Sequence, residues 1–562
     1  MTAACTESPT GTVKESTAST PSYTRENDPH DDSLYKPKTL KFWLVIACNL
    51  LALFIVALDR TIITTALPQI TNEFHRLGDI GWYVSAYMLT SAVGQLMYGR
   101  LYKFYDMKMT FLASIIVFEA GSALCGAAPN SGSFIVGRAI SGFAGAGIFS
   151  GCMLVIIPMV PLHIRPRFQG LFGMIFGVAS VLGPLIGGGF TKTISWRWCF
   201  YINLPIGAAS WVFMALVWHP PHRQREAVSL FTHFKRLDPL GMLFFIPAMA
   251  CLMLALQWGG SKYAWGNGRI IVLLVVFGVL LIAYGAVQAW LPDTATIPPK
   301  VVMQRSIFCA ALYTFCVSGG MILLIYYIPE WFQTVKGFSS TLSGVDMFPL
   351  MLSMIVSTFA GGITTQQVGY YVPAMLFCPI VMATGLGLLS TWSIDTGTPR
   401  WVGYQFLSGF GLGFGLQISG LVVQRILPAD DIPLGIALLF FLQQLGGSVF
   451  STVGDNMLTN MLISRLVGVV PGLDSSEIIN SGATDLIRTA PDTDKLTVRL
   501  AYNHSITRIF LAAMGVTLGG LVSALGMEWL SIKKPEDGQT EAETSGRGEE
   551  KEQAKSAEEV IA

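Results

Sequence analysis

The stretch FWLVIACNLLALFIVALDRTIITTA, residues 42–66, decides the fold class of this chain. It is long and apolar enough to cross the hydrocarbon core of a bilayer, which takes roughly 20 residues of helix. The rest of the chain has the same character: 52% of the 562 residues are hydrophobic and 13% are charged, about half the charged share of a soluble protein. Because a bilayer solvates apolar side chains and penalises charge, the sequence predicts an all-α integral membrane protein.

Fourteen apolar runs of about this length follow one another along the chain. They cover approximately residues 42–66, 80–99, 110–128, 133–159, 168–190, 196–218, 239–258, 270–290, 306–332, 344–365, 371–392, 401–423, 433–456 and 506–530. Arginine and lysine are more frequent in the loops that face the cytoplasm if the N-terminus lies inside. The sequence therefore predicts fourteen transmembrane helices with both termini in the cytoplasm.

Three polar segments flank or interrupt these runs. Residues 1–41 and the acidic residues 533–562 contain few apolar side chains, so we expect two disordered cytoplasmic tails. Residues 457–505 would form a long extracellular loop, which contains the glycosylation sequon Asn503-His504-Ser505. We expect Asn503 to remain unmodified because it lies close to the membrane.

Two parts of the membrane region resemble each other, which indicates an internal repeat. Three ordered anchors match at offsets of 263, 267 and 265 residues: Gly99 with Gly362, Ser141-Gly142-Phe143 with Ser408-Gly409-Phe410, and Gly170 with Gly435. The repeat predicts two six-helix bundles, residues 42–218 and 306–532, with a cytoplasmic linker and two inserted membrane helices at residues 219–305. Parallel repeats of this kind enclose a central substrate site in transporters.

Two membrane charges are candidates for proton coupling. Asp59 lies roughly 25 Å along the first helix, in its outer half, and Arg138 lies a turn or two into the fourth helix, which enters from outside. The two side chains could therefore meet, whereas Arg60 points about 100° away from Asp59. A carboxyl group beside a movable cation can load and release a proton. The alternative is a static ion pair that fastens the two helices.

Further membrane residues are weaker candidates. Glu119, near the middle of the third helix, has no basic neighbour in the sequence, and helix packing explains it about as well as proton carriage. Asp455 calls for the same caution. Polar and aromatic side chains of the C-terminal half could line a substrate cavity, although aromatic belts at the membrane surface explain end-of-helix rings equally well. The cavity candidates are Gln405, Gln417, Gln443, Gln444, Tyr326 and Tyr327.

The fifth predicted helix is unusually rich in glycine and contains one proline. Small residues allow close contact between helices, and a proline removes one backbone hydrogen bond, so this helix could bend and slide during a conformational change. Plain close packing is the alternative. The residues concerned are Gly183, Pro184, Gly187 and Gly188.

Several classes of function are disfavoured. The chain has no GxxxxGK[ST] loop to hold ATP, and its seven histidines fall in tails or near loops, which disfavours a membrane metalloenzyme. A formal net charge of +1 disfavours nucleic acid as a partner. We therefore expect no enzymatic activity, no metal and no cofactor, with a proton gradient as the energy source. The expected partners are a small-molecule substrate and the lipid bilayer, and we expect a monomer.

Several motifs resemble the major facilitator superfamily, in particular its fungal fourteen-helix drug:proton antiporters, over residues 42–530. Leu58-Asp59-Arg60-Thr61-Ile62-Ile63 is similar to the motif of helix 1, and Gly137-Arg138-Ala139-Ile140-Ser141-Gly142 to that of helix 4. Gly183-Pro184 with Gly187-Gly188 resembles the antiporter motif. The most specific match is Trp196-Arg197-Trp198-Cys199-Phe200-Tyr201-Ile202-Asn203-Leu204-Pro205. The resemblance implies the major facilitator fold and proton coupling through Asp59 and Arg138.

The loop after the second helix departs from the superfamily pattern. It contains the predicted gating residues Gly99, Arg100, Lys103 and Lys108, but lysine stands at position 103 where the pattern has aspartate, and Asp106 replaces a glycine. Because of these two departures, the sequence does not determine which charges form the network of the gate.

The resemblance to aflatoxin and HC-toxin efflux carriers implies proton-coupled export of a fungal secondary metabolite, toxin or drug. We expect the plasma membrane as its location, with the vacuolar membrane as the alternative. Import, for example of a siderophore, and a sensor that does not transport remain alternative functions.

Overall fold

The computed structural model describes residues 35–533, apart from 77–78, 221–234, 261–262, 293, 471–485, 488–490 and 492. The predicted tails therefore lie almost entirely outside the described residues. Thirteen described helices are long and apolar enough to cross a membrane. Helix α2 (Ile80–Phe104) is also long enough at 25 residues but is less apolar. It packs between α4 and α18 within the bundle and completes the fourteen predicted spans.

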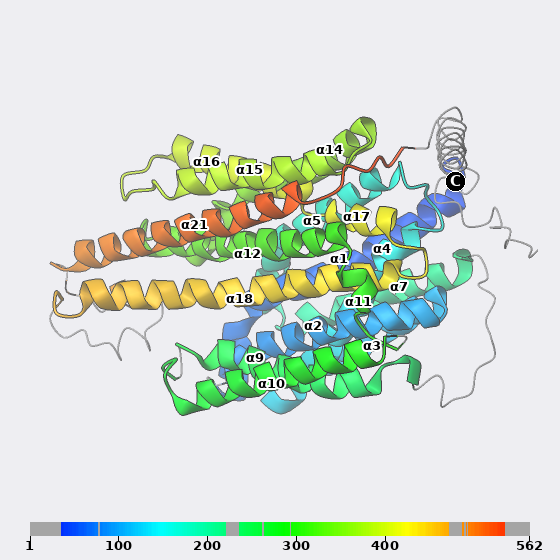
Figure 1. Cartoon of the computed structure of the whole chain (residues 1–562). Helices are drawn as coiled ribbons and strands as arrows, with labels where there is room; N and C mark the ends of the chain where they lie inside the picture. Colours follow the sequence, from blue (N-terminus) through cyan, green and yellow to red (C-terminus); the bar gives the residue numbers. More distant parts are fainter. Residues whose placement is uncertain are drawn as a thin grey trace, which may run out of the picture.

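The helices of the N-terminal half run in antiparallel succession (Figure 1). They are α1 (Leu40–Phe74), α2, α3 (Met107–Gly126), α4 (Ser131–Ile156), α5 (Arg165–Thr193), α6 (Trp198–Tyr201) and α7 (Asn203–Val217). Short capped turns separate them: Asp106 caps α3 by accepting a hydrogen bond from Met109 N, and Asn130 caps α4 by accepting one from Ser133 N. These caps satisfy backbone N–H groups in the first turns of α3 and α4.

The C-terminal half repeats this arrangement. Its helices are α12 (Arg305–Thr334), α13 (Ser340–Val345), α14 (Phe348–Val368), α15 (Val372–Leu389), α16 (Thr398–Gly415), α17 (Ser419–Ile426), α18 (Ile432–Leu466) and α21 (Lys495–Leu525). A short helix, α11 (Pro299–Val302), precedes them. Helix α14 ends at Gly369, whose φ of 80° favours glycine.

The helix pairings obey a two-fold pseudosymmetry. In the N-terminal half α2 packs on α4, α3 on α4, α1 on α5 and α1 on α7, and in the C-terminal half α14 packs on α16, α15 on α16, α12 on α18 and α12 on α21. The contacts between the halves match in the same way, because α5 packs on α14 and α18 packs on α2. This pattern agrees with the duplicated six-helix unit that the glycine and serine anchors predict.

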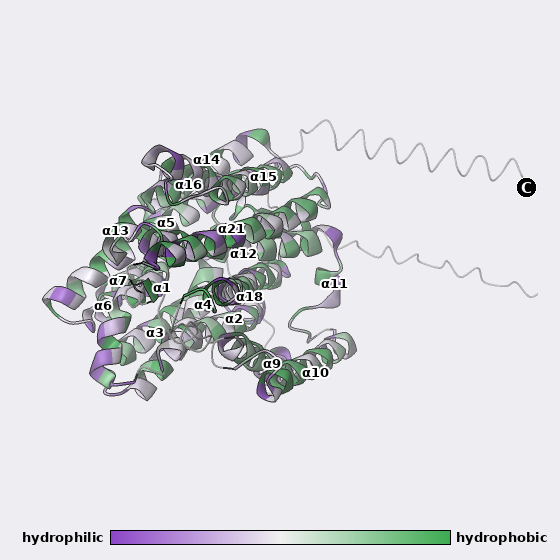
Figure 2. Cartoon of the chain, turned by 90° about the vertical axis from the view of Figure 1, so that its left-hand side faces the viewer, coloured by the Kyte–Doolittle hydropathy of each residue, from purple (hydrophilic) through white to green (hydrophobic). Residues whose placement is uncertain are grey.

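The inserted helices α9 (Pro239–Trp258) and α10 (Gly268–Trp290) lie side by side at the edge of the bundle (Figure 2). Helix α9 packs on α2. A buried apolar cluster that includes Val93 of α2, Met249 of α9 and Phe441 of α18 joins these three helices. Most of α10 is exposed and apolar, for example at Val272 and Ile282. A helix of this kind faces lipid rather than water.

The inserted pair is connected to both halves. Near its cytoplasmic end, the Arg100 guanidinium of α2 donates hydrogen bonds to the backbone oxygen of Arg236, just before α9. At its outer end, Trp265 Nε1, between α9 and α10, donates a hydrogen bond of 2.7 Å to Asn456 Oδ1 of α18. One connection therefore reaches the N-terminal half and the other reaches the C-terminal half.

Three predicted boundaries are wrong. Helix α1 continues through Pro68 to Phe74, well beyond the predicted end at residue 66. Helix α18 continues to Leu466 and α21 begins at Lys495, so both ends of the predicted loop 457–505 are helical. Polar residues lower the hydropathy of these segments. Their buried side chains, such as Leu462 and Val498, nevertheless pack like those of the membrane-spanning parts.

Asn503 consequently lies inside α21 and not in a loop. Its amide nitrogen donates a hydrogen bond of 3.1 Å to the backbone oxygen of Trp392, and its Oδ1 accepts one of 2.8 Å from Trp331 Nε1. A glycan on this nitrogen would break the contact of α21 with α12 and with the segment that follows α15. The geometry therefore supports the expectation that Asn503 is unmodified.

Candidate functional site

The two predicted proton-coupling charges form an ion pair inside the N-terminal half. Arg138 Nη1 of α4 lies 2.7 Å from Asp59 Oδ2 of α1, and the two side chains are 2% and 0% exposed. Arg138 Nε also donates to the backbone oxygen of Tyr83, and its guanidinium lies 4.4 Å from the ring centre of Tyr87. The predicted meeting of Asp59 and Arg138 is thus confirmed, whereas their role in proton transfer is a separate question.

An amide from the most specific sequence motif completes the surroundings of Asp59. Asn203, the first residue of α7, directs its Nδ2 toward Asp59 Oδ1 at 3.4 Å and toward Ser122 Oγ of α3 at 3.2 Å. The carboxylate therefore has polar contacts from α4 and α7 while it is closed off from water. This role of Asn203 is not among the predictions from the sequence, although the residue stands in the Trp196–Pro205 motif.

Glu119 lies in the same part of the N-terminal half. Both of its carboxyl oxygens are buried and have no hydrogen-bond partner among the described residues. The side chain fits because Gly207 of α7 lies opposite, where a Cβ would overlap Glu119 Oε1. A buried carboxyl group without a hydrogen-bonding partner is costly in its charged form, so the surroundings favour the neutral acid.

A central cavity of about 920 Å³ lies between the halves. Its deepest lining residues include Gln95 and Phe440, and its outermost ones include Gln333 of α12 and Thr459 of α18. The cavity thus extends from the middle of the membrane to the outer ends of the helices. Six methionines line it, Met88, Met253, Met321, Met347, Met351 and Met354.

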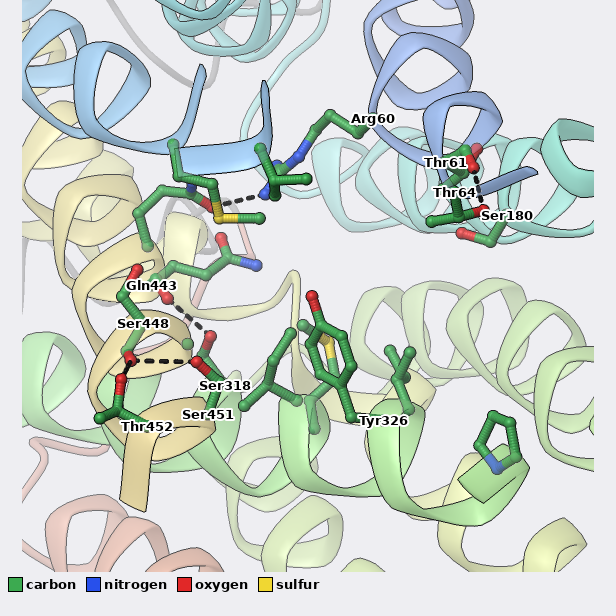
Figure 3. Close-up of a pocket in the computed structure, with 18 of the residues that line it drawn as sticks. Arg60, Thr61, Thr64, Ser180, Ser318, Tyr326, Gln443, Ser448, Ser451 and Thr452 are labelled. Carbon is green, nitrogen blue, oxygen red and sulfur yellow. Dashed lines mark hydrogen bonds between the residues drawn. The ribbon is translucent and has the colours of Figure 1, made fainter. Parts of the chain in front are cut away.

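A polar stripe of α18 faces this cavity. Gln444, Ser448, Ser451 and Asp455 follow one another at the spacing of one helix face and all line the cavity. Figure 3 shows Ser448, Ser451 and Thr452 in succession on this helix, opposite Tyr326 of α12. The stripe extends about 16 Å, since Asp455 lies eleven residues beyond Gln444 and the helix rises about 1.5 Å per residue.

Four of the six predicted cavity residues line the cavity, namely Gln417, Gln443, Gln444 and Tyr326. The other two predictions are wrong. Gln405 lies inside α16 and is fully buried within the C-terminal half, whereas Gln417 lies in the turn that follows α16. Tyr327 is 1% exposed and donates a hydrogen bond of 2.8 Å to Asp455 Oδ1, behind the cavity wall that Tyr326 forms.

Arg60 is a cavity residue that the sequence analysis noted without assigning it a role. Its side chain points into the cavity, about 100° away from Asp59, and Nη2 donates a hydrogen bond of 2.8 Å to Gln444 Oε1 (Figure 3). The bond joins the N-terminal half to the C-terminal half. A charged side chain late in helix 1 was the signal that could have found it.

The cytoplasmic side of the cavity is closed by contacts between the halves. Lys103 Nζ, at the end of α2, lies 2.6 Å from Asp431 Oδ1, at the start of α18, and Lys300 Nζ lies 3.4 Å from the other carboxyl oxygen. Gly99 allows this approach, because a Cβ there would lie 3.2 Å from the backbone oxygen of Pro433 and would overlap Ala437. We call Lys103, Lys300 and Asp431 the cytoplasmic charge cluster.

The predicted gating residues therefore divide into two sets. Gly99 and Lys103 meet the opposite half, whereas Arg100 contacts the segment before α9, and Lys108 Nζ donates to the backbone oxygen of Ala215 within its own half. Lysine at position 103 does not remove the gate, because an aspartate on α18 supplies the opposite charge.

The glycines of α5 make two different contacts. Gly183 and Gly187 pack against Thr61 and Thr65 of α1, so tightly that added Cβ atoms would overlap those side chains. The corresponding position at Gly188 is open, with no described atom within 4 Å, so this member of the predicted motif makes no close packing contact here. Pro184 lies within the continuous helix and lines the cavity.

The face of α5 that could slide lies closer to the cytoplasm than the predicted motif. Added Cβ atoms at Gly170 and Gly173 would meet Thr358 of α14, in the other half. From the other side of this interface, a Cβ at Gly362 of α14 would overlap the backbone oxygen of Pro166 at the start of α5, as the pseudosymmetric Gly99 approaches the backbone oxygen of Pro433. This interface joins the two halves on the cytoplasmic side, whereas the antiporter motif joins α5 to α1 within one half.

Two pseudosymmetric six-helix halves, with a cavity that reaches the outer side and a closed contact on the other, define a membrane transporter of the alternating-access type. The family model of the Major Facilitator Superfamily matches residues 50–451. The chain belongs to this superfamily, whose members are transporters and not enzymes.

Curated relatives and a solved structure agree with this assignment. An MFS-type transporter of Claviceps purpurea is 45% identical over 504 residues, which cover 89% of this chain and 87% of the relative. The efflux pump aflT of Aspergillus parasiticus is 42% identical, with 88% of this chain and 97% of the pump covered. The human organic anion transporter MFSD10 has a TM-score of 0.55 at 14% identity, covering 85% of this chain and 99% of that one, and supports the fold alone.

Proposed function

We propose that this protein exports a small hydrophobic molecule across the plasma membrane in exchange for protons. The names of its relatives support the direction, because aflT is an efflux pump. The central observation for coupling is that consecutive residues of α1 serve two sites: Asp59 lies in the sealed ion pair with Arg138, and Arg60 lies in the central cavity. A change at one site therefore acts on the other through a single helix.

Protonation of Asp59 would remove the charge that holds Arg138. The ion pair is fully buried, so loss of one charge leaves the other without its counter-ion, and the local arrangement of α1 and α4 must change. Because Arg60 bonds to Gln444 across the cavity, a shift of α1 alters the contact between the halves. Asn203 orients the Asp59 carboxyl group through its Nδ2 contact, and the buried carboxyl group of Glu119 is the second group of this region that can carry a proton.

The proposal requires no resident cofactor or metal, since the proton gradient supplies the energy. We also propose that a monomer is sufficient, because the cavity and the ion pair are formed within one chain. Nucleic acid has no place in this scheme. The partners are the transported molecule and the surrounding lipid.

Proton coupling can be tested in proteoliposomes that contain pyranine and have an acidic interior. An uncharged aromatic probe such as 1-pyrenebutanol, added outside, should raise the interior pH faster than in protein-free vesicles, because each transported molecule releases protons. Asp59→Asn should abolish this increase. The matched control is Asp395→Asn, the same change at an exposed loop position, which should behave as wild type.

The outcomes separate the alternatives. If Asp59→Asn dissipates the gradient as fast as the wild type, coupling through Asp59 is wrong. If neither neutral nor acidic aromatic probes cause more proton movement than in protein-free vesicles, a sensor without transport becomes the better reading. Probe movement away from the acidic compartment would indicate symport and therefore import.

A further inference from the structure

Arg60 is unusual among the membrane charges because it faces the cavity and, in the part of the chain that the structure describes, has no carboxylate partner. Among the described residues, its polar contact is the neutral Gln444, and its guanidinium lies 5.9 Å from the ring centre of Phe176. Asp59 is already paired with Arg138 on another face of α1. An intramembrane cation is costly, so one that faces a binding cavity without a counter-ion is best explained by a ligand.

The remaining charges of the cavity lie elsewhere. Glu330 of α12 and Asp455 of α18 line its outer part. Asp455 lies about 16 Å along α18 from Gln444, the residue that Arg60 contacts. The cavity is therefore positive at its inner end and acidic toward its mouth, and the serines of the α18 stripe and apolar side chains line the part between.

The walls indicate the size and shape of what binds. Methionines and phenylalanines line the same cavity as Arg60, including Met351, Met354 and Phe176, whose ring centre lies 5.9 Å from the Arg60 guanidinium. Methionine side chains adapt to ligands of different outline, and aromatic rings stack on flat ligands. A guanidinium presents a planar fork of donors that suits a carboxylate or another strong acceptor oxygen.

We propose that Arg60 binds an acidic or strongly accepting oxygen, such as a carboxylate or phenolate, on an otherwise apolar aromatic substrate. The substrate enters with this group at the inner end of the cavity and its rings against the methionines. This inference rests on the proposed function of the cavity as the transport site. It adds the substrate class and the residue that determines it.

Two matched fluorescent probes test the proposal, 1-pyrenebutanoic acid and 1-pyrenebutanol, which differ in the group at the end of the same chain. Binding is measured by fluorescence anisotropy on purified protein without any pH gradient. We expect the wild type to prefer the acid, and Arg60→Gln to reduce the ratio of acid to alcohol affinity about tenfold or more. Arg60→Lys should retain part of the preference because it keeps the charge.

The control variant is Arg269→Gln, which removes a cation whose side chain contacts Tyr263 near the outer end of α10. It should leave the ratio unchanged. Retained binding of the alcohol by Arg60→Gln shows that the variant is folded. A purely structural role for Arg60 predicts equal weakening of both probes, and that result, or an unchanged ratio, would overturn the proposal.

The two proposals fail separately. If Arg60→Gln loses the acid preference but no gradient is coupled to transport, the binding role of Arg60 stands and proton coupling does not. If the wild type couples protons to export but shows no acid preference, the reverse holds.

Discussion

Reversal of one charge in the cytoplasmic charge cluster should open the cytoplasmic side. Lys103 and Asp431 are 19% and 10% exposed and lie 2.6 Å apart. Such a partly buried pair lies between surface pairs, which contribute at most about 1 kcal/mol, and buried pairs, whose disruption costs about 3–5 kcal/mol. We expect Lys103→Glu, which replaces attraction with repulsion, to cost the closed state about 2 kcal/mol. This shifts the ratio of closed to open molecules roughly 30-fold.

The shift can be measured by the distance between spin labels at Met109 and Val368, two exposed side chains at the cytoplasmic ends of α3 and α14. Lys103→Glu should add a population with a longer distance. The double exchange Lys103→Asp with Asp431→Lys should recover part of the closed population. Recovery is incomplete because Lys300, 3.4 Å from Asp431, would then face a lysine.

Lys108→Gln is the matched control, because Lys108 contacts Ala215 within the same half. It should leave the distances unchanged. The reasoning is refuted if Lys103→Glu has no effect, or if the double exchange closes the gate no better than either single variant.

Two further outcomes follow from contacts of the same molecule. Burial opposes the ionised form of Asp431, but the hydrogen bond and charge of Lys103 prevail and lower the pKa of its carboxyl group. The pair is therefore fully formed above the ordinary carboxyl pKa of about 4 and is lost only as the pH falls through the lowered value. The same spin-label distances should thus be constant from pH 5.5 to 7.5 in an Asp59→Asn background, and opening within this range would contradict the assignment. Gly183→Ala would bring a Cβ to 2.8 Å from Thr61 Cβ. It should destabilise the protein by about 1–3 kcal/mol and lower the melting temperature measured by intrinsic fluorescence. Gly188→Ala, which meets open space, should not, and equal effects would exclude the packing explanation.

The features predicted correctly from sequence depend on position along a helix. The depth of Asp59 and Arg138 in two antiparallel helices follows from residue counts, so their meeting could be derived. The repeat of helix pairings similarly follows from anchors at a nearly constant offset. Hydropathy located the membrane spans but not their ends, because polar residues continue α18 and α21 beyond the apolar core.

Features that depend on the direction of a side chain were predicted less well. Tyr326 and Tyr327 are neighbours in sequence, yet one lines the cavity and the other lies behind its wall. The partner of Lys103 could not be predicted, because Asp431 is 328 residues away and meets it through the packing of the two halves. The charge of Arg60 can be read from the sequence. Whether its side chain faces the cavity depends on how the two halves pack, which the sequence does not show.

The inserted pair α9–α10 is attached to α2 near the cytoplasm and to α18 at the outer surface. When the two halves rotate to open the cytoplasmic side, these attachment points move relative to each other. The pair must then either release the Trp265–Asn456 bond or tilt in the lipid to follow both ends. The two additional helices thus act as a tether, and the stiffness of the surrounding bilayer enters the energy of every transport cycle.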